Sequence, residues 1–115
     1  MHDDPIDQAT FTALEDTAGA DFVSELVGTF LDEAPPMLAE LRRARDDGHA
    51  ERFRRAAHSL KSNGNTFGAL ALGRMAKALE LGGIAAIGHG EVPTLDALEQ
   101  EYARVAAALA KKRHV

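Results

Sequence analysis

Apolar residues recur at helical spacing along almost the whole chain, and this pattern excludes most folds. Phe22, Leu26 and Phe30, for example, follow one another at four-residue intervals, a spacing that places side chains on one face of an α-helix. No segment alternates apolar and polar residues as a half-buried strand does, and the one hairpin-type dipeptide, Asn63-Gly64, lies inside a helical pattern. The chain is therefore predicted to be all-α.

Glycine, proline and capping residues divide the pattern into helices. Asp7 and Thr94 are suitable N-caps, while Gly19, Gly48 and Gly68 are suitable ends. The predicted helices cover residues 7–17, 20–47, 50–66, 70–81 and 94–111, with a glycine-rich loop over 82–93. They predict a single domain over residues 1–115, an antiparallel up-and-down four-helix bundle with an additional short N-terminal helix.

Two of these helices run against local propensity. Pro35-Pro36 interrupts the second one, but the apolar pattern resumes at Met37, so one long kinked helix is favoured over two helices in near-continuation. The third contains four weak helix formers at 62–65, yet its apolar face continues through Gly64 to Phe67. Glycine on the buried side would let a neighbouring helix approach closely.

Composition excludes several classes of protein. The 115 residues include no cysteine, which excludes disulfides, thiolate metal sites and cysteine nucleophiles. A formal net charge of -5 argues against a general nucleic-acid binder. The N-terminal residues lack the features of a secretory signal, and no apolar run approaches the roughly 20 residues of a membrane span. We therefore expect a cytoplasmic protein without nucleic-acid or membrane partners.

His58 lies on the polar side of the third predicted helix. At about 100° per residue, four residues share its side: Arg54, Lys61, Ser62 and Asn65. By periodicity alone, an ordinary surface position on an amphipathic helix explains His58 at least as well as a functional role does.

Metal binding and hydrolysis do not account for this histidine. The five histidines (residues 2, 49, 58, 89 and 114) include no pair at i, i+3 or i+4, so no helix face offers two ligands. Ser59 adjoins His58, but neighbours in a helix point in different directions and do not form a nucleophile–base pair. No glycine-rich phosphate loop is present, which excludes a self-sufficient ATP-using kinase. We expect no metal or other cofactor of the chain's own.

A single exposed histidine does suit phosphoryl transfer. An unprotonated imidazole is a competent nucleophile towards phosphorus, and the reaction needs little beyond in-line positioning and cations that balance charge. Lys61 lies at i+3 and Arg54 at i−4 along the same helix. Ser62, at i+4, is small enough to admit the active site of a partner, which can supply metal and acids.

The residues around His58 resemble the signature of the histidine-containing phosphotransfer (HPt) domain. Ala57-His58-Ser59-Leu60-Lys61-Ser62, followed by Gly68-Ala69, is similar to Ala-His-x-Leu-Lys-Gly/Ser with a downstream Gly-Ala or Gly-Leu pair. Ser62 stands where many members have glycine, which is a mild departure. Three further stretches resemble the second, fourth and last helices of the family: Phe30 to Pro35, Leu79-Glu80 and Leu98 to Tyr102.

The resemblance implies a phosphorelay intermediate that uses no ATP. His58 would be the phosphoacceptor, taking a phosphoryl group on Nε2 from the aspartyl phosphate of one receiver domain and passing it to another. Lys61 would help to hold the phosphoryl oxygens, and Glu80 would hydrogen-bond the imidazole and favour its protonated form. The expected partners are receiver domains of a hybrid sensor kinase and a response regulator, with Mg²⁺ on the receiver. The carrier itself would be monomeric.

Less specific interpretations stay open at this stage. Ser62 and Asn65 are predicted to form the surface of close approach and Arg54 a secondary basic flank, although simple solvation explains Arg54 better than a specific role. A helical adaptor of the same fold would bind partners without phosphotransfer, but it would need neither His58 nor Lys61. The family docks receivers through an apolar patch on its first two helices. Three residues are candidates for that patch or for the core: Ile6, Phe11 and Leu14.

Overall fold

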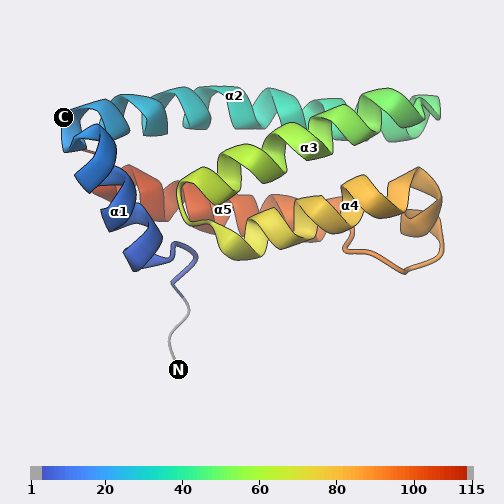
Figure 1. Cartoon of the computed structure of the whole chain (residues 1–115). Helices are drawn as coiled ribbons and strands as arrows, with labels where there is room; N and C mark the ends of the chain where they lie inside the picture. Colours follow the sequence, from blue (N-terminus) through green and yellow to red (C-terminus); the bar gives the residue numbers. More distant parts are fainter. Residues whose placement is uncertain (1–3, 114–115) are drawn as a thin grey trace.

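The computed structural model describes residues 4–113, which form five α-helices and no strand. The helices are α1 (Gln8–Ala18), α2 (Ala20–Asp47), α3 (Ala50–Thr66), α4 (Leu70–Gly88) and α5 (Leu95–Lys112). The four long helices run up and down beside one another, and the short α1 lies across the end at which α3 turns into α4 (Figure 1). The predicted all-α bundle with an additional N-terminal helix is confirmed.

The helix α2 passes through Pro35-Pro36 without a break. Its buried face includes Phe30 and Ala34 before the prolines and Leu38 after them. Both prolines themselves are exposed. The packing of one continuous apolar face therefore outweighs the hydrogen bonds that the prolines cannot donate, and the prediction of a single long helix is confirmed.

The predicted loop over residues 82–93 is wrong in its first half, because α4 continues to Gly88. The helix changes direction at Gly83, whose φ of 74° and ψ of -174° are not helical. Glycine adopts this conformation without the steric cost that a Cβ would bring. Ile84 and Ile87 then pack against the core. Burial of these apolar side chains outweighs the weak helix propensity of the surrounding glycines.

Aliphatic and aromatic side chains from all five helices form one core. Phe30 of α2 connects two other parts of it, since its ring centroid lies 5.4 Å from that of Phe67 and 5.9 Å from that of Tyr102. In the three helices that follow α2, the largest side chains with less than 2 % exposure are Phe53, Leu60, Leu72, Leu79, Leu98, Val105 and Leu109. Each such residue contributes roughly 1.5–3 kcal/mol by leaving water.

Two glycines lie where α3 packs against α4. A Cβ added to Gly73 of α4 would overlap Oδ1 of Asn65 in α3, and one added to Gly64 would lie 3.4 Å from the Leu72 side chain. The two helices are antiparallel (Figure 1). In this register Asn65 lies opposite Gly73, and one heptad away on each helix His58 lies opposite Glu80. The expectation that Gly64 faces a neighbouring helix is confirmed.

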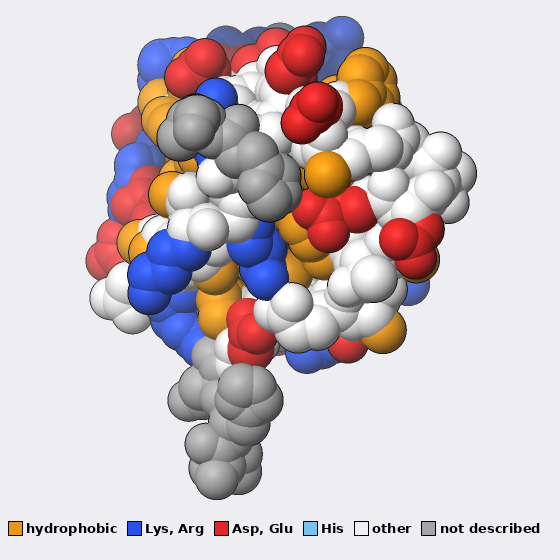
Figure 2. Space-filling model, turned by 90° about the vertical axis from the view of Figure 1, so that its left-hand side faces the viewer, with side chains coloured by type: hydrophobic (Ala, Val, Ile, Leu, Met, Phe, Trp, Pro, Cys, Tyr) orange, Lys and Arg blue, Asp and Glu red, His pale blue; other side chains and the backbone are white. Residues whose placement is uncertain are grey.

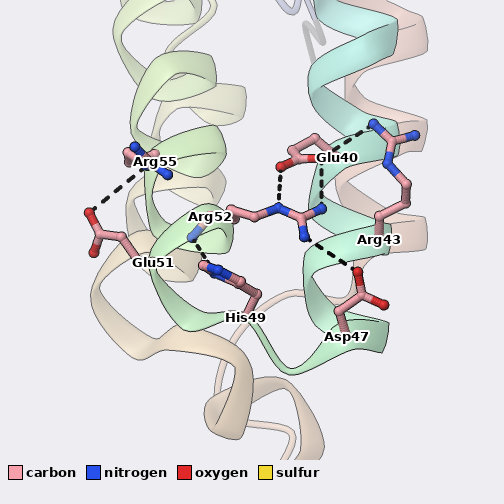
Figure 3. A network of polar contacts seen from close by, with 7 residues as sticks. All are labelled: Glu40, Arg43, Asp47, His49, Glu51, Arg52 and Arg55. Carbon is pink, nitrogen blue, oxygen red and sulfur yellow. Dashed lines mark hydrogen bonds and ion pairs between the residues drawn. The ribbon is translucent and has the colours of Figure 1, made fainter.

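A network of ion pairs fixes the start of α3 against the end of α2 (Figure 3). Glu40 accepts hydrogen bonds from Nε and Nη2 of Arg52 at 2.8 and 3.1 Å. The Arg52 guanidinium lowers the pKa of Glu40 to about 2. Asp47 lies 3.4 Å from the same guanidinium, and Nδ1 of His49 accepts from the backbone N–H of Arg52 at 3.3 Å as the N-cap of α3.

The segment before α1 is bonded to the turn between α3 and α4. The backbone N–H of Asp7 donates to the carbonyl of Gly68 at 2.8 Å. Ile6 and Phe11 are only 1 % and 4 % exposed, and Leu14 is half-buried against the core. Ile6 and Phe11 are therefore core residues and not part of an apolar docking surface.

Among the described residues, the end of the bundle that carries α1 displays both acidic and basic side chains (Figure 2). Figure 2 shows this face, on which acidic and basic side chains are interspersed around small apolar areas. No described helix has the length and apolar character needed to cross a membrane.

Replacing Gly68 by alanine should destabilise the protein. Its φ is 85°, and a Cβ there would lie 2.8 Å from the backbone oxygen of Asp7. The left-handed conformation alone costs a residue with a Cβ about 1–2 kcal/mol, so we expect at least this loss in the free energy of unfolding, measured by chemical denaturation. Gly88→Ala is the control, because nothing lies within 4 Å of its added Cβ and the change should be neutral or slightly stabilising. Equal stability of the two variants would contradict this account.

Candidate functional site

His58 stands near the middle of α3, on the rim that faces α4. Its side chain is 53 % exposed, whereas Ala57 and Leu60 beside it are buried in the core. The helix therefore anchors the backbone of this residue through its neighbours and leaves the imidazole accessible.

A single carboxylate of α4 holds both the imidazole and a lysine. Oε2 of Glu80 lies 2.8 Å from Nδ1 of His58, and Oε1 lies 2.9 Å from Nζ of Lys61. Glu80 is only 12 % exposed and Lys61 24 %. The register in which α3 packs against α4 brings these three side chains together.

The ion pair with Lys61 governs the charge of this cluster. Lys61 is the largest cause that lowers the pKa of Glu80 below the ordinary value of 4.5, the contact with His58 adds to it, and partial burial acts against both. Glu80 is therefore ionised at neutral pH and can only accept hydrogen bonds. Nδ1 of His58 must carry the shared proton. In the neutral ring, Nε2 then holds the free lone pair and is the nucleophilic nitrogen.

The other residues predicted for the site lie further from the imidazole or have different neighbours. Arg54 forms a close pair with Glu51 at 2.6 Å, and its Nη1 lies 4.0 Å from Oε2 of Glu80. Ser62 is exposed. The Asn65 side chain lies over Gly73 of α4, so it packs between the helices as well as lining the surface.

Two features of the site were missed by the sequence interpretation. One is Glu51, which engages the guanidinium of Arg54; its i,i+3 spacing was a usable signal. The other is Gly73, whose missing Cβ admits Asn65. The spacing of seven residues from Gly73 to Glu80 matches that from His58 to Asn65, but this match has meaning only once the two helices are known to pair.

No group of three potential metal ligands occurs within residues 4–113. Two of the five histidines, His2 and His114, lie outside the described residues.

Comparison with known families assigns the chain to one of them. The family model for the Hpt domain matches residues 25–108, which is well over half of the chain, so the protein belongs to the Hpt domain family. Searches of curated proteins and of solved structures returned no match. Hpt domains are carriers in histidine phosphotransfer within two-component systems, where they interact with receiver domains; they are not kinases.

The titration of Glu80 should depend on Lys61. Because the folded-state pKa of Glu80 lies below 4.5, the ion pair stabilises the fold above that pH, and this stabilisation is lost as the pH falls through the folded-state pKa. We expect Lys61→Met to raise the pKa of Glu80, measured by NMR of its carboxyl carbon. Lys77→Met removes an exposed lysine three residues before Glu80 and should leave the pKa nearly unchanged. An equal shift in both variants would mean that net charge, and not the contact with Lys61, controls the carboxylate.

Proposed function

We propose that this protein is a phosphorelay intermediate with His58 as its phosphoacceptor. The observation that carries the proposal is the 2.8 Å contact between Nδ1 of His58 and an ionised Glu80. It fixes the tautomer with a free lone pair on Nε2, within a sequence motif that resembles the phosphoacceptor motif of the family. Exposure of the ring allows the active site of another protein to reach it.

The proposed reaction needs no proton to leave the histidine. Nε2 of His58 attacks the phosphorus of an aspartyl phosphate on a receiver domain, the N–P bond forms, and the O–P bond breaks to release the aspartate carboxylate. The proton on Nδ1 stays in its hydrogen bond with Glu80, which balances the positive charge that the ring gains. Transfer to a second receiver is the reverse of these steps.

The remaining components are divided between carrier and partner. Lys61 would bind the phosphoryl oxygens, and Arg54 would add a more distant positive charge. The partners would be the receiver domains of a hybrid sensor kinase and of a response regulator, which would supply Mg²⁺. The carrier would act as a monomer without ATP. An adaptor without phosphotransfer shares the fold but has no use for a histidine oriented in this way.

Labelling tests the assignment of His58. When the protein is mixed with a receiver carrying labelled aspartyl phosphate, we expect it to gain label that is acid-labile and base-stable, as a phosphohistidine is. His58→Gln should gain none, because the nucleophilic nitrogen is gone. Absence of label in the wild type with every receiver of the source organism, or equal label in His58→Gln, would exclude the relay function.

Access of a receiver to His58 should depend on a small residue at position 62. Ser62 is exposed one helical turn from the imidazole, so Ser62→Tyr should slow transfer from a receiver by about tenfold or more through misplacement of the reacting groups. Phosphorylation by phosphoramidate, a small donor, should continue at the wild-type rate. Ala107→Tyr, on the exposed side of α5, is the control and should affect neither rate. If Ser62→Tyr slows both donors equally, the side chain acts on the histidine itself and not on docking.

A further inference from the structure

The cation expected to bind the phosphoryl group is already bound in this structure. Nζ of Lys61 lies 2.9 Å from Oε1 of Glu80, and the same carboxylate holds His58 through its other oxygen at 2.8 Å. Lys61 is therefore paired with Glu80 when His58 carries no phosphoryl group.

This ion pair is more protected than a typical surface pair. Its partners are only 24 % and 12 % exposed, so solvent screens their attraction less than it screens two exposed side chains. The neighbouring Arg54 is less available to replace Lys61 at Glu80, because Arg54 is held by Glu51 at 2.6 Å and reaches Glu80 only at 4.0 Å.

Phosphorylation adds a second anion that attracts the same lysine. The phosphoryl group carries between one and two negative charges near neutral pH, and it would be attached at Nε2, across the ring from the nitrogen that Glu80 contacts. The single ammonium group of Lys61 then has two anionic partners on different sides of the imidazole. Unless Lys61 bridges the Glu80 carboxylate and the phosphoryl group, it binds one of these anions only by leaving the other.

We propose that Glu80 competes with the phosphoryl group for Lys61 and thereby limits the stability of phospho-His58. Glu80 is in this respect a positioning residue that acts through Lys61. The inference rests on the proposed phosphorelay function. This competition would favour transfer of the phosphoryl group from His58 to a receiver, because its release restores the Lys61–Glu80 pair.

The variant Glu80→Gln isolates the charge of this residue. Glutamine keeps an oxygen that accepts the Nδ1 proton of His58, but it binds Lys61 weakly. The substitution also removes direct repulsion between Glu80 and the phosphoryl group, and it weakens the interaction with the phosphorylated ring. These effects do not involve Lys61, so a double-mutant cycle with Lys61→Met separates them from the competition.

The measurement is the equilibrium ratio of phospho-His58 to receiver aspartyl phosphate, determined with one receiver domain for each variant. In the wild-type background, Glu80→Gln should raise this ratio about fivefold, the effect of losing one partly protected ion pair. In the Lys61→Met background, the same substitution should change it less than about twofold. In the Lys77→Met background, Glu80→Gln should raise the ratio as much as it does in the wild-type background. Circular dichroism of each variant establishes that it is folded, and Lys61→Gln replaces Lys61→Met if the latter unfolds.

The outcomes separate this inference from the function on which it rests. An equal effect of Glu80→Gln with and without Lys61, or no effect in the wild-type background, overturns the competition while the relay function stands. A wild-type protein that accepts no phosphoryl group from any receiver overturns the proposed function itself.

Discussion

The close approach of α3 and α4 is the constraint on which the site depends. Gly64 and Gly73 lie at this contact, in a register that pairs Asn65 with Gly73; a Cβ at Gly73 would displace the end of the Asn65 side chain, and one at Gly64 would touch Leu72. That register places a residue of α4 next to the imidazole of α3. His58, Lys61 and Glu80 all belong to these two helices, so the packing of α3 against α4 brings the site together.

Such an arrangement reconciles two requirements of a carrier. The imidazole must be accessible to the active sites of other proteins, yet its orientation must not vary, since an in-line reaction tolerates little misplacement. A flexible surface histidine satisfies only the first requirement. Here the buried residues beside His58 fix its backbone, and Glu80 fixes its ring, while more than half of the side chain remains accessible.

Much of this structure could be predicted from the sequence, and the exceptions have physical reasons. Helical periodicity located all five helices, because burial of an apolar face dominates over local propensity, even at the two prolines of α2. Periodicity did not predict the end of α4, because a short apolar segment there lies among glycines and packs against the core only after the change of direction at Gly83. Proximity of His58 to Glu80 came from the family resemblance alone, because no pattern within one helix reveals the register of its neighbour. The pairing of Lys61 with Glu80, and not with solvent, likewise required the packed helices.

The packed structure extends further towards the N-terminus than the family match does. The family match begins at residue 25, inside the helix Ala20–Asp47, and leaves out α1 altogether. Nevertheless Ile6 and Phe11 are buried as deeply as the matched core residues, and Asp7 bonds to the turn directly behind the histidine helix. The shared family segment and the physical folding unit are therefore different in this chain. A fragment beginning at residue 25 would keep the phosphoacceptor motif but lose the support beneath the end of its helix.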